Sequence, residues 1–211
     1  MSETPEMPEV SREELRHHGT LWMLDLAGAS PMQADAQASV SWECAGSEMA
    51  LPLSQAMGLA APTEVLQRFT RRCKCYLGKI EREIATYGWV SFDDEHIGEL
   101  DLTIRMPANN AYIWDCATLP AYRGLRLYPA LLAYILSELR AGGIARVWIG
   151  ADEDNVASQK GMALAGFRPM IDIGLFHQDT GPRAWIRGRP AISEQELDEA
   201  CRVIIGAERL V

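Results

Sequence analysis

Two apolar runs separated by a predicted helix stand out in the second half of the chain. The first covers residues 112–118, and the second, residues 145–151, is a continuous apolar run of the kind that lies in the middle of a sheet. Residues 129–140 between them predict a helix that ends at Gly142-Gly143. A strand, a helix and a strand in this order predict two parallel strands with a right-handed crossover.

The loop between the first run and the helix is basic and contains a glycine. Residues 122–126 read Tyr-Arg-Gly-Leu-Arg, and Pro129 suits the first helical turn, where its missing N–H would be unpaired anyway. The first amides of a helix have no intrahelical partner, and the helix dipole favours negative charge at that end. The sequence therefore predicts an anion-binding site at this loop.

The rest of the chain predicts short helices and strands, which places it in the α/β (α+β) class. Before residue 110, these elements are a helix over 11–18, a strand over 21–26, an irregular segment over 27–46, helices over 48–59 and 63–72 (the second capped by Thr63), strands over 75–80 and 84–92, and a further strand over 97–106. After residue 151, they are a helix over 156–165, a hairpin of strands over 170–176 and 184–187, and a helix over 193–205 with a Ser193/Glu196 capping box.

Composition and charge narrow the class of protein. The 211 residues are 48% hydrophobic and 23% charged, so we expect one globular domain over residues 11–211 after a disordered tail over residues 1–10. The formal net charge of -9 argues against a non-specific nucleic-acid binder. No apolar run approaches the roughly 18 to 20 residues of a membrane span. The acidic N-terminus lacks the pattern of a secretory signal, so a cytoplasmic protein is expected.

The five cysteines are odd in number and scattered along the chain. Cys73 and Cys75 form a C-x-C pair, but no second pair or nearby histidine completes a zinc site. Reduced thiols, without a metal, are therefore the expected state.

Three segments of the second half follow one another in a specific order and spacing. They are residues 119–124 (LPAYRG), residues 147–149 (VWI), and residues 155–158 (NVAS) followed by 165–167 (AGF). Together they resemble the GCN5-related N-acetyltransferase (GNAT) superfamily, over residues 21–187 in topology and over 113–168 in motifs. The resemblance implies a mixed, mostly antiparallel central sheet with a splayed parallel strand pair and helices on both faces.

The resemblance also implies that the predicted anion is the pyrophosphate of acetyl-coenzyme A (acetyl-CoA), used as an acyl-donor substrate without a metal. In the family, the loop after the fourth strand wraps the pyrophosphate with backbone amides, and the pantetheine arm enters the gap between the splayed strands. Carried over residue by residue, the binding positions are Cys116, Ala117, Thr118, Arg123, Gly124, Leu125, Arg126, Leu127, Tyr128, Asn155 and Ser158.

The chain departs from the family pattern at three of its positions. Arg126 and Tyr128 stand where the loop usually closes with glycine or alanine, and Arg126 either meets a phosphate directly or points into solvent. The family tyrosine that can protonate the leaving thiolate falls at Met162, which has no proton to donate. A water, Ser158 or another hydroxyl can serve instead, or the step proceeds unaided, because a thiol with a pKa of about 8.5 is a tolerable leaving group.

Carboxylates on the central strands are the candidates for the catalytic base. Asp115 lies in an otherwise apolar strand, where burial would raise its pKa, and its alternative role is a structural carboxylate. Glu99 lies on a strand that often lines the acceptor site in the family, and its alternative is plain solvent exposure. Cys116 is expected to pack in the sheet, on the face opposite to Asp115, rather than to act as a nucleophile.

These observations favour an N-acetyltransferase that moves an acetyl group from acetyl-CoA to a primary amine of a small molecule or peptide by direct attack. A catalytically silent protein of the same fold, which binds an acyl-CoA or a protein partner, is the alternative from another class. An acyl donor larger than acetyl is a third hypothesis. No nucleic-acid or membrane partner is expected, and the final hairpin and C-terminal helix are candidate contacts of a homodimer.

Overall fold

The computed structural model describes residues 16–28, 34–178 and 181–210, and its main feature is a nine-stranded sheet in the order β12-β10-β9-β1-β8-β7-β4-β3-β2. A second sheet has the order β11-β6-β5. The strands are β1 (Arg16–Asp25), β2 (Ser41–Ala45), β3 (Cys73–Ile80), β4 (Glu83–Ser91), β5 (Glu95–Ile97), β6 (Leu102–Ile104), β7 (Asn110–Thr118), β8 (Arg146–Asp152), β9 (Arg168–Gln178), β10 (Gly181–Gly188), β11 (Ile204–Ile205) and β12 (Ala207–Arg209). Neighbours in the large sheet are antiparallel except the β7–β8 and β10–β12 pairs, which confirms the predicted mixed, mostly antiparallel sheet.

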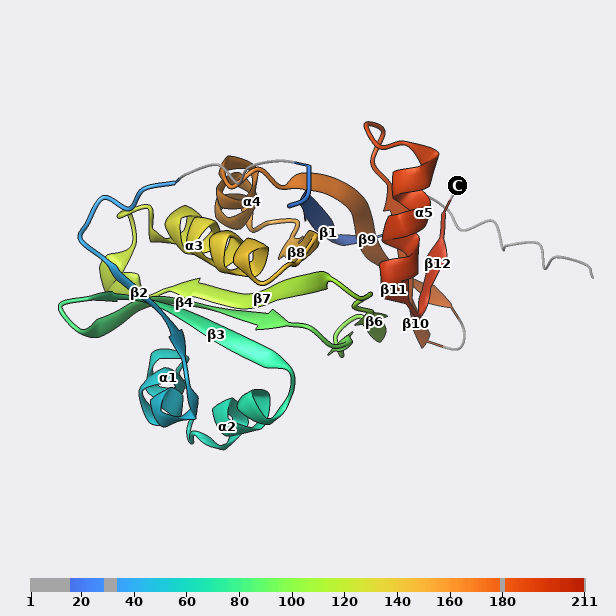
Figure 1. The fold of residues 1–211 in the computed structure, drawn as a ribbon. Helices are drawn as coiled ribbons and strands as arrows, with labels where there is room; N and C mark the ends of the chain where they lie inside the picture. The colour runs from blue at the N-terminus through green and yellow to red at the C-terminus, as the bar shows by residue number, and fades with distance from the viewer. Residues whose placement is uncertain (1–15, 29–33, 179–180, 211) are drawn as a thin grey trace, which may run out of the picture.

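Helices lie on both faces of the large sheet (Figure 1). α3 and α4 cover one face, α1 and α2 cover the other, and α5 stands at the β9–β10 end. The helices are η1 (Ser47–Met49), α1 (Ala50–Ala56), α2 (Thr63–Thr70), η2 (Pro120–Tyr122), α3 (Leu127–Ala141), α4 (Val156–Leu164) and α5 (Glu194–Val203). Within the described ranges, no helix is long and apolar enough to cross a membrane.

The predicted strand-helix-strand unit is confirmed, because α3 joins the parallel strands β7 and β8. Their register covers only residues 110–113 of β7 opposite residues 146–149 of β8. Both strands, which are described over their whole length, continue past this point without pairing with each other. They therefore diverge, and the edge of β7 that faces β8 keeps backbone groups available for another partner.

A β-bulge interrupts β7 just after the divergence begins. On its other side, Trp114 lies opposite Trp89 of β4 and Ala117 lies opposite Tyr87, so β7 holds one extra residue between these pairs. Asp115, within the bulge, has a φ of 43°, in the left-handed region that side chains rarely adopt. The bulge therefore changes the direction of the side chains along the free edge of β7.

Two predictions in the first part of the chain were wrong because long-range pairing overrides the local pattern. Residues 16–18, predicted as the end of a helix, belong to β1, which pairs with β8 on one side and β9 on the other. The predicted irregular segment over 27–46 contains β2, which pairs with β3 at the edge of the sheet. The predicted disordered tail and residues 11–15 lie outside the described residues.

The strand predicted over residues 97–106 is instead part of the hairpin of β5 and β6. Its turn is closed by a 3.1 Å bond from the Leu100 N–H to the Ile97 carbonyl, and Asp101 has a φ of 48°. The predicted cap of α2 was also wrong, because Pro62 occupies the N-cap and Thr63 is the first helical residue. The β5–β6 hairpin forms one wall of a cavity.

The C-terminal helix is capped as predicted. The Ser193 hydroxyl accepts from the Glu196 N–H, and the Glu196 carboxylate accepts from the Ser193 N–H. Arg168 also donates to this carboxylate at 2.5 Å, and these bonds hold the pKa of Glu196 at about 2. The capping box and Arg168 therefore fix α5 to the start of β9.

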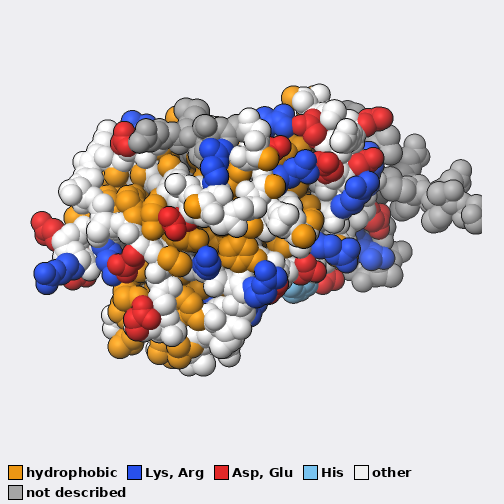
Figure 2. Space-filling view, viewed as in Figure 1, with side chains coloured by type: hydrophobic (Ala, Val, Ile, Leu, Met, Phe, Trp, Pro, Cys, Tyr) orange, Lys and Arg blue, Asp and Glu red, His pale blue; other side chains and the backbone are white. Residues whose placement is uncertain are grey.

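On the opposite side of the molecule, Figure 2 shows apolar side chains at the surface over α1, where Leu51 is 56% exposed.

Candidate functional site

A groove of about 630 Å³ lies where the end of β7, the N-terminus of α3 and α4 meet; we refer to it as the helix groove. Among the described residues, no backbone N–H of residues 124–128 donates to an acceptor, and Arg126, at the N-cap of α3, makes no side-chain cap hydrogen bond. These amides and the start of the helix dipole give the groove the character of an anion site. The loop predicted from the sequence is therefore open to a ligand at its backbone.

Backbone geometry explains why glycines are expected in this loop. Gly124 has a φ of 85°, and Arg126 has a φ of 55° and a ψ of 31°, the left-handed conformation that glycine adopts without strain. A Cβ built on Gly124 meets nothing within 4 Å. The departure at Arg126 thus keeps the loop shape that a glycine would have, at the cost of local strain.

Positive charge gathers around the helix groove. Arg123 and Arg126 line it, together with Lys160 of α4, and none of the three makes an ion pair within the described part of the chain. Sequence reasoning missed Lys160. A signal was available, because residues 157, 160, 161 and 164 follow the i, i+3, i+4, i+7 spacing of one helix face, and all four line the groove.

We expect Arg126→Gly to raise the free energy of unfolding by about 0.5–1 kcal/mol, because glycine removes the left-handed strain while loosening the unfolded chain. Chemical denaturation measures the change. Arg123→Gly is the matched control, since Arg123 is also exposed but has an ordinary φ of -65°. That variant is expected to gain nothing. Equal changes in the two variants would contradict the strain at Arg126.

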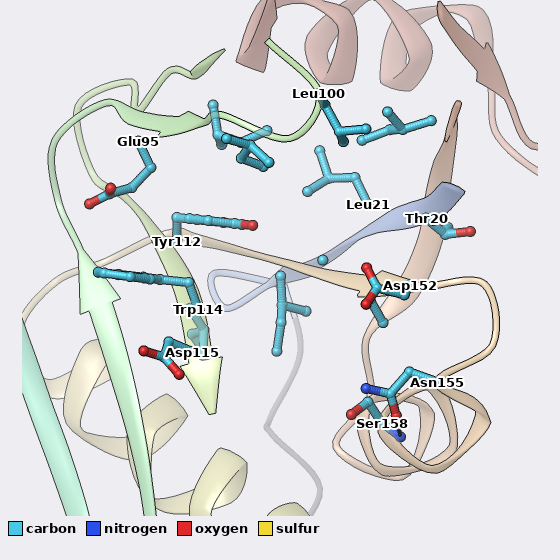
Figure 3. A pocket seen from close by; sticks show the side chains of 18 of the residues that line it. Thr20, Leu21, Glu95, Leu100, Tyr112, Trp114, Asp115, Asp152, Asn155 and Ser158 are labelled. Carbon is cyan, nitrogen blue, oxygen red and sulfur yellow. Dashed lines mark hydrogen bonds between the residues drawn. The ribbon is translucent and has the colours of Figure 1, made fainter. Parts of the chain in front are cut away.

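A second cavity, of about 840 Å³, adjoins the helix groove at the diverging strands; we refer to it as the strand cavity. Its walls come from β1, the β5–β6 hairpin, β7 and β8, with the start of α4 at one end (Figure 3). Tyr112 and Trp114 project into it from β7, and Glu95 lies beyond them on the hairpin side. Of the tryptophans, Trp114 lines this cavity, whereas Trp22, Trp42 and Trp89 do not.

Asp115 lines the strand cavity, but its carboxylate is ion-paired. Arg68 of α2 donates to Asp115 and, at 2.7 Å, to Glu64. The guanidinium also lies 4.5 Å from the centre of the Trp114 ring and 5.2 Å from that of Trp89, so aromatic faces hold it in place. The Asp115 carboxylate is thus already paired with a guanidinium that is itself held in place, and this geometry favours the structural alternative for Asp115.

Three other carboxylates line the strand cavity. Glu95 is buried and bonded at 2.7 Å to Arg71, which neutralises it. Glu99, in the β5–β6 turn, is exposed, and Asp152 ends β8 on the side of the cavity where Asn155 and Ser158 lie (Figure 3). Neither Glu99 nor Asp152 pairs with a cation among the described residues. Two unneutralised carboxylates, from different elements, therefore line the cavity, and sequence reasoning found Glu99 but not Asp152.

The helix groove and the strand cavity meet at four shared residues, which are Cys116, Tyr128, Asn155 and Ser158. The Asn155 side chain caps α4 by accepting from the Ser158 N–H at 3.1 Å. The side chains of Ser158 and Tyr128 both line this junction, and burial raises the pKa of Tyr128. The Tyr128 ring lies against Gly161, where a built Cβ would come within 2.5 Å of the ring carbon Cδ1.

The sulfur-bearing side chains of Met162 and Cys116 both face the core. Met162 is fully buried and lines neither cavity. The Cys116 Sγ packs against Gly88 of β4, next to Leu131 and Ile135 of α3. Burial raises the pKa of its thiol. Cys116 thus faces α3, whereas the Asp115 carboxylate reaches Arg68 of α2. A buried thiol with a raised pKa is a weak nucleophile.

Nearly all positions expected to bind the acyl donor come together at the helix groove. Those that line it are Cys116, Ala117, Thr118, Arg123, Gly124, Arg126, Leu127, Tyr128, Asn155 and Ser158. Leu125 does not line it, and its carbonyl instead accepts from the Gln37 N–H at 2.9 Å. Of the residues expected to act in catalysis, Glu99, Asp115 and Ser158 line the strand cavity.

Solved structures of low sequence identity share this fold. An acetyltransferase of the GNAT family from Colwellia psychrerythraea superposes with a TM-score of 0.53 at 15% identity, over 74% of this chain and 53% of its own. A putative GNAT acetyltransferase from Novosphingobium aromaticivorans gives 0.51 at 17%, over 77% and 66%. The ribosomal-protein-S18-alanine N-acetyltransferase from Escherichia coli gives 0.52 at 14%, over 69% and 89%. The chain thus spans about half to two thirds of the length of the first two proteins.

No curated protein matches the sequence. The family model described as Acetyltransferase (GNAT) family matches residues 54–167, which is more than half of the chain. The matched range includes β7, the loop over residues 122–126, α3, β8 and α4, which surround the helix groove. The chain therefore belongs to the acetyltransferase (GNAT) family.

Proposed function

We propose that the protein is an N-acetyltransferase that transfers an acetyl group from acetyl-CoA to a primary amine of a small molecule or peptide. The observation that carries this proposal is the junction of two cavities of different chemistry at the divergence of β7 and β8. The helix groove is cationic and rich in free amides, whereas the strand cavity is acidic. A donor with phosphates and an amine acceptor can thus approach each other from opposite sides.

The residues of the helix groove fit acetyl-CoA as the acyl-donor substrate. The free amides of residues 124–128 and the side chains of Arg123, Arg126 and Lys160 suit a pyrophosphate and its neighbouring phosphate. The free edge of β7 after residue 113 offers N–H and C=O groups to the amides of a pantetheine arm. The thioester that such a donor carries supplies an acyl carbon for direct attack.

The strand cavity supplies what a cationic acceptor needs. An amine arrives as an ammonium ion at neutral pH and must lose a proton before it can attack. Glu99 and Asp152 can accept that proton directly or through water, whereas Asp115 is held by Arg68. Backbone N–H groups on the free edge of β7 can stabilise the oxyanion that forms on the acyl carbon.

Calorimetric titration with acetyl-CoA tests the donor site. We expect sub-millimolar binding by the wild type and a dissociation constant about 10- to 100-fold higher in Arg123→Ala/Arg126→Ala, since each factor of ten corresponds to about 1.4 kcal/mol of lost phosphate contact. The loss should shrink at high salt. Arg202→Ala, at an exposed arginine of α5, is the matched control and should bind like the wild type. Absence of binding by the wild type would overturn the proposal.

Release of CoA with a panel of amines tests the transfer itself. We expect turnover with cationic primary amines, and lower kcat/KM in Glu99→Gln or Asp152→Asn than in the wild type. A second candidate function, binding of an acyl-CoA without turnover, is favoured by the buried Met162 and the neutralised Asp115. Tight binding with no CoA release across the panel would establish that second function.

A further inference from the structure

The site of bond breaking follows from how the two cavities meet. If the donor lies in the helix groove and the acceptor in the strand cavity, the reacting thioester must lie where both have access. Only Cys116, Tyr128, Asn155 and Ser158 line both cavities among the described residues. The Asn155 side-chain oxygen is used by the α4 cap, and the Cys116 thiol faces the core. Tyr128 and Ser158 are the hydroxyl donors at the junction.

The structure around the two hydroxyl residues fixes where they lie. The Asn155 cap holds the Ser158 backbone at the first turn of α4. The Tyr128 ring is held against Gly161, which leaves no room for a side chain between α4 and the ring. The tyrosine hydroxyl is therefore positioned from α3, whereas Met162 of α4 points into the core.

We infer that the Tyr128 hydroxyl, whose ring is held against Gly161, donates a hydrogen bond to the CoA sulfur as that sulfur leaves. This inference rests on the proposed acetyl transfer. The amine nitrogen forms the C–N bond with the acyl carbon, the C–S bond breaks, and its electron pair moves to sulfur. The acceptor ammonium loses two protons in total. One is taken up by the thiolate, and the other passes to solvent.

Tyr128 acts in this step as a hydrogen-bond donor that keeps its own proton. Burial raises the pKa of its hydroxyl, whereas a free thiol has a pKa of about 8.5, so transfer of the phenolic proton to the thiolate would run uphill. A hydrogen bond to the developing negative charge needs no such transfer and acts where charge appears.

The test compares Tyr128→Phe with the wild type, because phenylalanine keeps the ring on Gly161 and removes only the hydroxyl. We expect kcat to fall about 10²-fold, as for loss of one donor to a developing charge, with little change in the KM for acetyl-CoA. Ser158→Ala should lose less. Tyr134→Phe is the matched control, since Tyr134 lies on the same helix, packs on Trp42 and lines neither cavity.

A second readout does not depend on turnover. The pKa of the CoA thiol in the binary complex, followed by the ultraviolet absorbance of the thiolate, should lie lower in the wild type than in Tyr128→Phe. Equal thiol pKa values in the two proteins, an unchanged kcat, or a raised KM with unchanged kcat would each overturn the role of Tyr128. Failure of the wild type to bind CoA or to release it with any amine would instead overturn the proposed function.

Discussion

Replacing Trp148 with alanine is expected to lower the free energy of unfolding by about 3–5 kcal/mol, the range for loss of a buried aromatic side chain. Trp148 is 1% exposed in β8, between Met23 of β1 and Tyr112 of β7. Its Nε1 donates to the Asn110 side-chain oxygen at 2.8 Å. The substitution leaves a cavity at the last stretch where β7 and β8 still pair.

Chemical denaturation and a conservative variant separate the two contributions of Trp148. Trp148→Phe keeps most of the ring volume and loses the bond to Asn110, so a smaller loss is expected. Leu51→Ala is the control for an exposed apolar residue and should change stability by less than about 0.5 kcal/mol. A loss below about 1 kcal/mol in Trp148→Ala would contradict the tight packing between β1, β8 and β7.

Gly161→Ala is expected to reduce stability even though alanine is the better helix former. Helix propensity alone favours alanine over glycine by about 1 kcal/mol. The new Cβ, however, would lie 2.5 Å and 2.7 Å from two carbons of the Tyr128 ring, and such overpacking costs about 1–3 kcal/mol. The net expected change is a loss of about 1 kcal/mol. Because the ring must shift, kcat should fall at least as far as in Tyr128→Phe.

The same substitution in a Tyr128→Ala background provides the decisive control. With the ring removed, the clash disappears and only helix propensity remains, so Gly161→Ala should now raise the free energy of unfolding by about 1 kcal/mol. The two backgrounds would then differ by about 2 kcal/mol, the coupling between these residues in a double-mutant cycle. The same sign in both backgrounds would contradict the contact between Tyr128 and Gly161.

The basic loop over residues 122–126 and the strands and helix around it could be predicted because their sequence signals are local. Continuous apolar runs mark strands that are buried on both faces, and a basic loop with a glycine before a helix start determines where free amides occur. The left-handed conformation at Arg126 shows why a glycine is expected there. Prediction failed for residues 16–18 and 41–45, because pairing with β8, β9 and β3 decides their conformation.

By itself, the sequence determined the mixed α/β class, the parallel β7–β8 pair and the place of the basic loop before α3. It could not assign roles to the groups that face each other across the site, because those contacts join residues far apart in the chain. The tertiary structure decided that Arg68, from α2, neutralises Asp115, and that the Tyr128 ring of α3 packs against Gly161 of α4. The physical reason is that periodicity reports burial and direction for one element, whereas charge pairing and hydrogen bonding depend on which elements the completed sheet brings together.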